Sequence, residues 1–392
     1  MKLLFLDWNS YCRKDVLQAF QNLGHTYSLY PLTETAHMLG SDQKTIQDIY
    51  EHIERGSFDF AFSMNYFPMV STACEQAGIP YISWIYDNPF QNGYSVNIIN
   101  SCNYIFTFDS AMYHELSSQG VSTVHYAPMA ANPERLLKLG RENLGGHSYD
   151  ISFVGALYNE DHNFYDEFVK NARIAGKEYY IGYIDSLIQI QLHLYGTNIL
   201  SSSLPKEIAE SHFASINEWT EQTAYFTTQE AIFADNVLCR KITAIEREQL
   251  LQKLSALYSV SLFTRDANAN LGQCQNLGYI DYYSGAPAVF HNSAINLNIS
   301  LRSIKNGIPL RAIEIMGAGG FLLSNFQSDF LQHFEPEHDF VYYENIEDAV
   351  EKAGYYLTHQ KERQEIAMNG WKKIKEYHTY EQRITEMLSL LH

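Results

Sequence analysis

Residues 294–325 constrain the fold of this chain more than any other stretch, because they contain all the parts of a strand–helix–strand unit. An apolar run, Ala294–Ser300, leads into a polar, glycine-containing loop, and Pro309 stands where a helix would begin. Proline suits the first helical turn, where its missing N–H would have no partner, and Gly319 suits the helix exit. The helix carries Glu314. Since amides at a helix N-terminus attract phosphate and a nearby carboxylate can bind a ribose hydroxyl, the unit predicts a nucleotide site.

The first 130 residues alternate short apolar runs with helical patterns. Strands that alternate with helices at this spacing are typical of a parallel sheet covered on both faces, as in a Rossmann-like domain. The predicted strands are Leu3–Leu6, Thr26–Tyr30, Phe58–Ser63, Tyr81–Tyr86, Tyr104–Thr107 and Thr123–Tyr126, and the predicted helices are Asp15–Leu23, Thr45–Glu54, Met69–Gln76 and Ala111–Ser118.

A second α/β region is predicted after the polar, glycine-containing stretch 132–149, which suits a linker. Its further strands are predicted at Asp150–Val154, Val260–Thr264, Gly278–Ile280, Ala288–Phe290, Gly320–Leu323 and Phe340–Tyr343, followed by a helical tail from residue 346. We therefore predict an α/β fold with two Rossmann-like domains, 1–140 (joined by 378–392) and 149–377, the second with a helical insertion at about 158–256.

Composition indicates a globular protein that does not bind nucleic acid. At 392 residues the chain can form two cores, and 46% hydrophobic residues are typical of a folded protein. The net charge of −18 opposes binding to a nucleic acid or to an anionic membrane, and allows only weak membrane association.

Cysteine usage and the N-terminus predict a cytoplasmic location. The five cysteines are scattered and form no C-x-x-C pair, which indicates a reducing compartment and no structural zinc. Asp7 interrupts the N-terminal apolar run, so this run predicts a strand and not a signal peptide. No apolar run approaches the roughly 20 residues that a transmembrane helix needs.

The region around Asn306 and Glu314 resembles the E-x7-E signature of group 1 glycosyltransferases with the GT-B fold. The resemblance is closer to the CgeB-like (spore maturation protein) branch. It rests on SFVGALY at 152–158, LNIS at 297–300, PLRAIEIMGAGGFLLS at 309–324, FEPEHDFVYY at 334–343 and HTY at 378–380. It covers most of the second predicted domain, and in the first it rests on strand order and on SWIYDNP at 83–89.

The resemblance implies two domains that face a cleft, with the donor bound by the second and the acceptor by the first. The implied reaction moves a sugar from a nucleotide diphosphate sugar to an acceptor such as a cell-surface glycan, a spore component or a protein. Metal-dependent single-domain glycosyltransferases usually hold a divalent ion with a D-x-D pair, and this sequence contains none. We therefore expect no metal and no other cofactor.

Carried over residue by residue, the resemblance implies that Glu314 hydrogen-bonds the ribose of the donor. Asn306 stands where many relatives have a glutamate that contacts the donor sugar, and an amide can hydrogen-bond a hydroxyl but supplies no negative charge. The other donor-site residues that the resemblance implies are Gly155, Asn298, Gly307, Ile308, Pro309 and Leu310.

Basic residues near the motif are candidates for the diphosphate, because sugar transfer releases a dianionic leaving group. The candidates are Arg311 and Arg265, followed by Arg302 and Lys305. Each of them could instead be solvated or paired. In particular, the i,i+3 spacing also allows an Arg311–Glu314 ion pair on an exposed helix face.

Asp87 is the candidate from the first domain, because it follows the strand Tyr81–Tyr86, and sites gather at the carboxyl ends of parallel strands. Its carboxylate could act as a general base toward an acceptor hydroxyl or as a contact to a sugar. The alternative is an Asx turn or helix cap ahead of Asn88-Pro89.

Other functions remain open on the sequence. Asn306 in place of a glutamate also fits a catalytically idle nucleotide-sugar-binding protein, and the two-domain scaffold also fits a nucleotide-sugar epimerase. A dinucleotide-dependent oxidoreductase is the weakest hypothesis, because no G-x-G-x-x-G follows the first strand.

Overall fold

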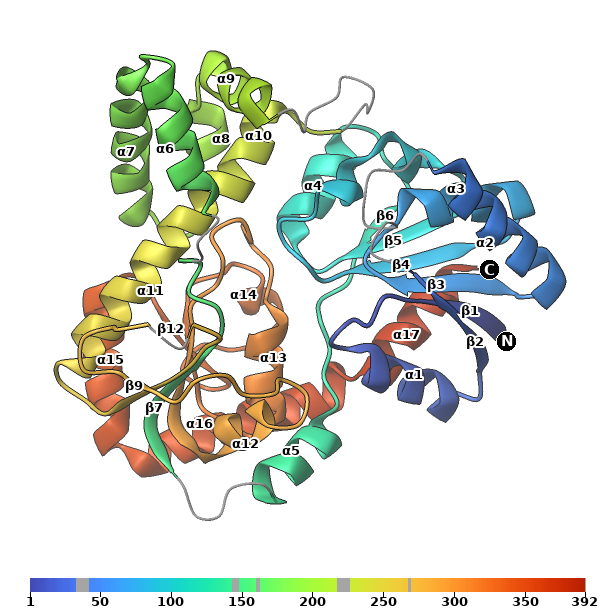
Figure 1. Cartoon of the computed structure of the whole chain (residues 1–392). Helices are drawn as coiled ribbons and strands as arrows, with labels where there is room; N and C mark the ends of the chain where they lie inside the picture. Colours follow the sequence, from blue (N-terminus) through green and yellow to red (C-terminus); the bar gives the residue numbers. More distant parts are fainter. Residues whose placement is uncertain (33–41, 143–147, 160–162, 217–225, 267–268, 392) are drawn as a thin grey trace. The chain divides into compact units, whose positions relative to one another are not determined.

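The structure, a computed structural model, describes residues 1–32, 42–142, 148–159, 163–216, 226–266 and 269–391. The chain divides into two compact units. The first consists of Met1–Ala131, Tyr377–His392 and the short segment Glu221–Thr227, of which residues 226 and 227 are described. The second consists of Asn132–Thr220 and Thr228–Glu376. Each unit has its own parallel sheet (Figure 1).

The sheet of the first unit has the strand order β2-β1-β3-β4-β5-β6, and all its neighbours are parallel. The strands are β1 (Lys2–Asp7), β2 (Thr26–Pro31), β3 (Phe60–Met64), β4 (Tyr81–Ile85), β5 (Asn103–Thr107) and β6 (Val124–Tyr126). The helices of this unit are α1 (Arg13–Asn22), α2 (Gln43–Gly56), α3 (Pro68–Ala77), α4 (Ser110–Ser118) and α17 (Tyr380–Leu388). Every residue of β3 and β4 is buried, as expected for central strands covered by helices on both faces.

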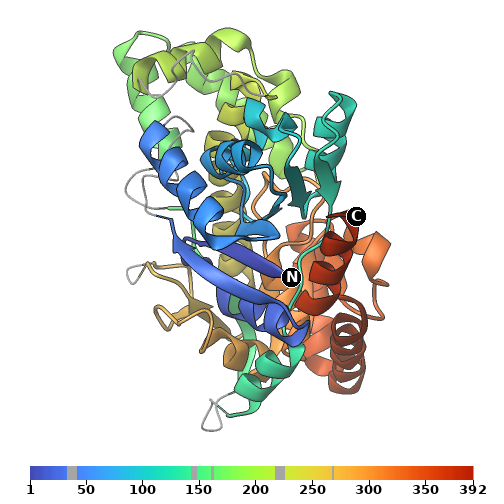
Figure 2. The same ribbon diagram turned by 90° about the vertical axis from the view of Figure 1, so that its right-hand side faces the viewer.

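The end of the chain belongs to the first unit. Helix α17 lies beside α1, as Figures 1 and 2 show, and Asn22 Nδ2 donates a hydrogen bond of 2.8 Å to Glu381. Thr379 and Gln382 form a capping box that fixes the start of α17. The prediction that the C-terminal helix returns to the first domain is therefore confirmed.

The sheet of the second unit has the strand order β12-β11-β10-β7-β8-β9, again all parallel. The strands are β7 (Tyr149–Val154), β8 (Val260–Phe263), β9 (Gln275–Asn276), β10 (Ser293–Asn298), β11 (Leu322–Asn325) and β12 (Val341–Tyr343). The helices that belong to this sheet are α5 (Pro133–Glu142), α11 (Cys239–Ser255), α12 (Ala286–Asn292), α13 (Leu310–Gly317), α14 (Phe330–His333), α15 (Ile346–Thr358) and α16 (Gln360–Tyr377). The predicted α/β fold with two Rossmann-like domains is confirmed.

The strand–helix–strand unit predicted at 294–325 is present as β10, α13 and β11. Pro309 is the N-cap residue of α13, so the helix itself begins one residue later, at Leu310. The polar loop between Asn298 and α13, residues 299–309, is called the donor loop below.

Between β7 and α11 the chain forms a helical insertion, drawn in green to yellow in Figure 1. Its helices are α6 (Phe164–Ile174), α7 (Glu178–Leu192), α8 (Leu200–Ser203), α9 (Lys206–Ile216) and α10 (Gln229–Phe233), and a π-helical turn, Ala234–Leu238, leads into α11. The insertion has a core of its own that includes Tyr180, Ile184 and Phe233. A helical insertion in the second unit is thus confirmed, but α11, which the predicted range 158–256 included, belongs to the sheet. Residues 160–162 and 217–225 lie outside the described ones.

Three predicted segments are wrong. Residues 133–142 of the expected linker form the helix α5. The start of this helix has a typical cap, because Asn132 Oδ1 accepts a hydrogen bond from Arg135 N and Pro133 occupies the first helical position. The rest of that linker includes 143–147, which lie outside the described residues. The predicted strand Ala288–Phe290 lies inside α12, because a short apolar run does not distinguish a buried strand from a buried helix. The predicted strand Gly278–Ile280 is a loop.

Among the helices that the structure describes, none is both long and apolar enough to cross a membrane.

The core of the insertion generates a prediction about pH. His212 on α9 is buried between the rings of Phe168 and Phe233, and burial lowers the pKa of its imidazole to about 4. Between pH 4 and 6.5 the unfolded chain therefore binds a proton that the folded chain excludes, so the stability of the fold falls as the pH falls through this window. We expect His212→Phe, which cannot take up a proton, to remove up to about 3 kcal/mol of this dependence.

Urea unfolding of the wild type and of His212→Phe, followed by circular dichroism from pH 7 down to pH 4, measures the difference. Other titrating groups are the same in both proteins and cancel. Parallel curves for the two proteins would show that His212 takes up its proton without penalty in the folded state.

Candidate functional site

The second sheet reverses its direction of growth between β7 and β10. From β7 the chain continues to β8 and β9 on one side, and from β10 it continues to β11 and β12 on the other. Such a switch point leaves a crevice outside the carboxyl ends of the two strands, and ligands of open α/β sheets bind there. Val154 ends β7, Asn298 ends β10, and the donor loop starts at this place.

Arg311, on the first turn of α13, lies across these two strand ends. Its Nη1 donates to Val154 O (3.1 Å), its Nε and Nη2 donate to Asn298 Oδ1 (2.9 and 2.8 Å), and Nη2 also donates to Ile299 O (3.1 Å). Gly155 makes room for it, because a Cβ on Gly155 would lie 2.6 Å from Arg311 Nη1. The sequence-based alternative, an exposed Arg311–Glu314 pair, is wrong, since Arg311 contacts these groups and Glu314 is buried.

A second arginine, Arg247 on α11, reaches the same place, although it is not among the predicted site residues. Its Nη2 donates to Ile299 O (2.5 Å) and its Nη1 to Ala156 O, while its guanidinium lies over the rings of Phe153 and Tyr158. The available signal was its position, because Thr243, Arg247 and Leu250 share the buried face of α11. A charged residue on the apolar face of a helix indicates a buried polar contact.

The two guanidiniums are buried and lie close enough to repel each other. Burial lowers the pKa of Arg311 to about 10, with the nearby charge of Arg247 adding to the effect, and burial also lowers the pKa of Arg247. Within the described part of the chain neither forms an ion pair, and their acceptors are neutral carbonyl and amide oxygens. Buried charges are normally paired, so two adjacent unpaired cations create a strong local attraction for an anion.

The donor loop is fixed at several points along its length. Arg247 and Arg311 both bind Ile299 O, Asn325 Oδ1 accepts from Ser300 N (2.8 Å), and Gln327 Nε2 donates to Ile304 O (3.0 Å).

The loop residues that the resemblance singles out follow these anchors. Asn306 O accepts from Asp329 N (3.1 Å), and Gly307 and Ile308 are buried just before Pro309 and Leu310.

Glu314 has a basic partner from α5. Its side chain is 9% exposed, and Arg135 Nη2 lies 3.9 Å from Glu314 Oε1. Arg135 also donates from Nη1 to Tyr283 O (2.8 Å), and its guanidinium lies 4.0 Å from the centroid of the Tyr283 ring. A nearby cation favours the ionised carboxylate. Arg135 is not among the predicted site residues, because residues 132–149 are predicted to form a linker.

The remaining predicted basic residues and Asn298 have different surroundings. Asn298 is fully buried, and its amide donates to Ser300 Oγ (3.1 Å) and Ser324 Oγ (2.9 Å). Arg265 is exposed, with its guanidinium 5.2 Å from the centroid of the Tyr279 ring, and Lys305 is half-buried in the donor loop. Arg302 forms a buried ion pair with Glu246. Direct contact of Asn298, Arg265 and Lys305 with a donor stays a prediction.

Asp87 lies at the corresponding edge of the first sheet, which switches direction between β1 and β3. It is exposed, and its Oδ2 accepts from Asn65 Nδ2 (2.7 Å). Asn65, buried just after β3, accepts from the backbone amides of Tyr86 and Asp87 (3.1 and 3.3 Å). This clamp holds the exposed carboxylate at the end of β4.

No cluster of three or more His, Cys, Asp or Glu side chains suited to a metal ion occurs within the described ranges. Metal independence stays a prediction.

Comparison with known proteins gives a partial family match. Residues 240–389 match a family model described as glycosyl transferase-like. The matched segment begins in α11 and includes the whole of the β10–α13–β11 unit. No curated protein sequence matches the chain.

Several solved structures are similar over nearly their whole length. A glycosyltransferase from Rickettsia africae ESF-5 has a TM-score of 0.56 at 10% identity, covering 99% of this chain and 97% of that one. Sucrose-phosphate synthase from Thermosynechococcus elongatus has a TM-score of 0.54 at 8% identity (100% and 98% covered). HepE from Anabaena, in complex with UDP and glucose, has a TM-score of 0.50 at 11% identity (99% of each chain). At these identities the likeness establishes the fold, which is GT-B, and with the family match it supports a glycosyltransferase.

The close approach at Gly155 is testable. In Gly155→Ala the new methyl group forces Arg311 Nη1 away from Val154 O, and a buried hydrogen bond to a charged donor is worth about 1.5–3 kcal/mol. We expect the thermal unfolding midpoint to fall by several degrees. The matched control is Gly182→Ala in α7, where the added Cβ meets open space and alanine favours the helix by about 0.5–1 kcal/mol. Equal midpoints for Gly155→Ala and the wild type would mean that Arg311 is not held as described.

Proposed function

We propose that this chain is a glycosyltransferase of the CgeB-like branch that transfers a sugar from a nucleotide diphosphate sugar to a glycan, spore component or protein, without a required metal. The observation that carries the proposal is the pair Arg247 and Arg311 at the switch point of the second sheet. A buried positive charge at this place suits a ligand with a diphosphate.

The arginine pair supplies the electrostatic part of the mechanism. As the bond between the sugar and the diphosphate breaks, negative charge grows on the departing phosphate. Fixed positive charges in a poorly solvated environment stabilise this charge without having to reorganise. The amides of Gly307 and Ile308 and the start of α13 add fixed dipoles, and Arg265 is the exposed cation for the outer part of the donor.

Glu314 and Asn306 orient the rest of the donor in this proposal. Glu314, held by Arg135, accepts hydrogen bonds from the ribose hydroxyls, and Asn306 bonds the transferred sugar. An amide at 306 gives hydrogen bonds but no charge, so it positions the sugar and does not stabilise a developing positive charge on it. HepE was solved with UDP and glucose, and we therefore propose UDP-sugars as the first donors to test.

Asp87 is proposed as the general base that accepts the proton of the acceptor hydroxyl. The clamp from Asn65 uses one carboxylate oxygen and orients the group. A base must lie within hydrogen-bond reach of the proton it removes, and the exposure of Asp87 at the end of a parallel strand supports this role.

The second hypothesis is a catalytically idle nucleotide-sugar-binding protein, which Asn306 in place of a glutamate also fits. An idle protein binds the nucleotide without releasing nucleoside diphosphate from the donor. An epimerase changes the sugar and likewise makes no nucleoside diphosphate. Measuring the free nucleoside diphosphate formed from a donor sugar therefore separates the transferase from both alternatives.

Nucleotide binding is tested by a thermal-shift screen of the full chain with UDP, GDP, ADP, CDP and dTDP. A ligand that binds only the folded state raises the unfolding midpoint by mass action. We expect Glu314→Gln to weaken the best ligand about 10- to 100-fold, because a hydrogen bond to a charged acceptor is worth about 1.5–3 kcal/mol. The control is Glu347→Gln, which removes an exposed carboxylate on α15. The proposed function fails if none of the five nucleotides stabilises the wild type.

The role of Asp87 is tested by Asp87→Asn, which keeps the shape and the contact with Asn65 but removes the basic oxygen. We expect kcat for sugar transfer to fall about 100-fold or more, since general base catalysis contributes roughly 10²–10⁴. The affinity for the nucleoside diphosphate, measured by calorimetry, should stay at the wild-type value. Unchanged kcat would assign Asp87 to the turn that precedes Pro89.

A further inference from the structure

Arg302 in the donor loop has surroundings that do not suit a ligand contact. Its Nε donates to Glu246 Oε2 (2.7 Å), its Nη2 donates to the other carboxylate oxygen of Glu246, and its Nη1 donates to Leu194 O (2.9 Å). One face of the guanidinium covers Tyr195, with Cζ 4.1 Å from the ring centroid, and the side chain is 9% exposed. Burial opposes its charge, but Glu246 outweighs burial and raises the pKa of Arg302.

The backbone of Arg302 is held as firmly as its side chain. Thr243 Oγ1 accepts from Arg302 N (3.0 Å), and Asn198 Nδ2 donates to Arg302 O (3.3 Å). Tyr195 Oη completes the group by donating to Glu246 Oε1 (2.8 Å). Both backbone groups and the guanidinium are therefore bound to side chains and carbonyls outside the donor loop.

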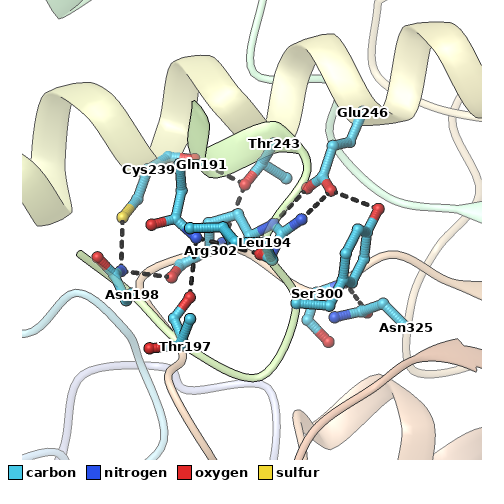
Figure 3. A network of polar contacts seen from close by, with 11 residues as sticks. Gln191, Leu194, Thr197, Asn198, Cys239, Thr243, Glu246, Ser300, Arg302 and Asn325 are labelled. Carbon is cyan, nitrogen blue, oxygen red and sulfur yellow. Dashed lines mark hydrogen bonds and ion pairs between the residues drawn. The ribbon is translucent and has the colours of Figure 1, made fainter. Parts of the chain in front are cut away.

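Most of these partners come from the helical insertion. Leu194, Tyr195 and Asn198 lie in the segment 193–199 between α7 and α8, whereas Glu246 and Thr243 lie on α11. Gln191, at the end of α7, shapes this segment: its Nε2 donates to Leu194 O (3.1 Å) and Thr197 O (2.8 Å), as Figure 3 shows. Gly196, at φ +74°, allows the segment to pass close to Phe326, because a Cβ at residue 196 would lie 3.2 Å from the Phe326 ring.

We propose that Arg302 is a positioning residue, and that the helical insertion acts through it to fix the donor loop. The inference rests on the proposed function, because it concerns the loop that carries Asn306, Gly307 and Ile308. Residues 299–309 form neither helix nor strand, so the conformation of this loop depends on contacts with groups outside it. A bidentate arginine–carboxylate pair accepts one geometry, so it specifies one loop conformation, whereas its net contribution to stability is small.

The insertion therefore belongs to the donor site. Segment 193–199 and α11 hold Arg302 from one side, while Arg247 and Arg311 hold Ile299, near the start of the same loop. An error of about 1 Å in such a loop would reduce the rate roughly 100-fold, because a donor bound in the wrong place does not react.

Four variants of the full chain test this inference. Arg302→Lys keeps the positive charge but removes the bidentate guanidinium, and Glu246→Gln keeps the shape of the side chain but removes its charge. The other two are the Arg302→Lys/Glu246→Gln double variant and Tyr195→Phe. The matched control is Lys206→Met, which breaks an exposed ion pair with Glu210 on α9 of the same insertion. The readouts are kcat and KM for donor hydrolysis, calorimetric affinity for the nucleoside diphosphate chosen by the thermal-shift screen, and the thermal unfolding midpoint.

We expect Arg302→Lys and Glu246→Gln each to lower kcat/KM about tenfold or more. The kcat/KM of the double variant should lie within about twofold of that of the less active single variant, because both changes break the same contact. Tyr195→Phe removes one hydroxyl and should lower kcat/KM by a smaller factor, so it keeps the inference testable if the charge variants fail to fold. Lys206→Met should match the wild type.

Three results would overturn the inference. If Arg302→Lys loses affinity for the nucleoside diphosphate while Glu246→Gln keeps it, Arg302 contacts the ligand directly. If the variants lower only the unfolding midpoint and leave kcat and KM unchanged, the network is merely structural. If the wild type binds no nucleoside diphosphate, the proposed function fails first and this inference fails with it.

Discussion

The structure of the second unit depends on two buried arginines at the carboxyl ends of β7 and β10. Arg247 comes from α11 and Arg311 from α13, and both donate to Ile299 O where the donor loop begins. Burying a cation is costly unless it is paired, and within the described residues these two have only neutral acceptors. The chain has a net charge of −18, yet it buries two positive charges at the switch point of its second sheet, the kind of place where open α/β sheets bind ligands.

Segments that look peripheral in the sequence supply the supports of this site. The expected linker is α5, and it brings Arg135 to Glu314. The helical insertion brings the segment 193–199 to Arg302. Apart from Gly155, the donor-site residues that the resemblance identifies lie between Asn298 and Glu314, but the groups that hold them come from elements far apart in the chain. This arrangement follows from physics, because a charged side chain can stay buried only where several donors and acceptors meet.

Two of the wrongly predicted segments have different causes. Ala288–Phe290 reads as a strand because a short apolar run fits either a buried strand or a buried helix, and only packing decides between them. Residues 132–149 read as a linker because their polar composition outweighed the Asn132-Pro133 signal of a helix start. Composition averages over a segment, whereas a cap is a single hydrogen bond.

The sequence by itself determined the strand–helix–strand unit, the two parallel sheets and the burial of the strands, because proline and glycine chemistry and apolar periodicity act over a few residues. Only the tertiary structure decided the partners of the charged groups. The spacing of Arg311 and Glu314 allows them to pair, yet Arg311 binds Asn298 and Glu314 faces Arg135. Arg302, expected at the diphosphate, pairs with Glu246. A charge selects its partner by distance and solvation in the folded chain, and these depend on contacts between residues far apart in the sequence.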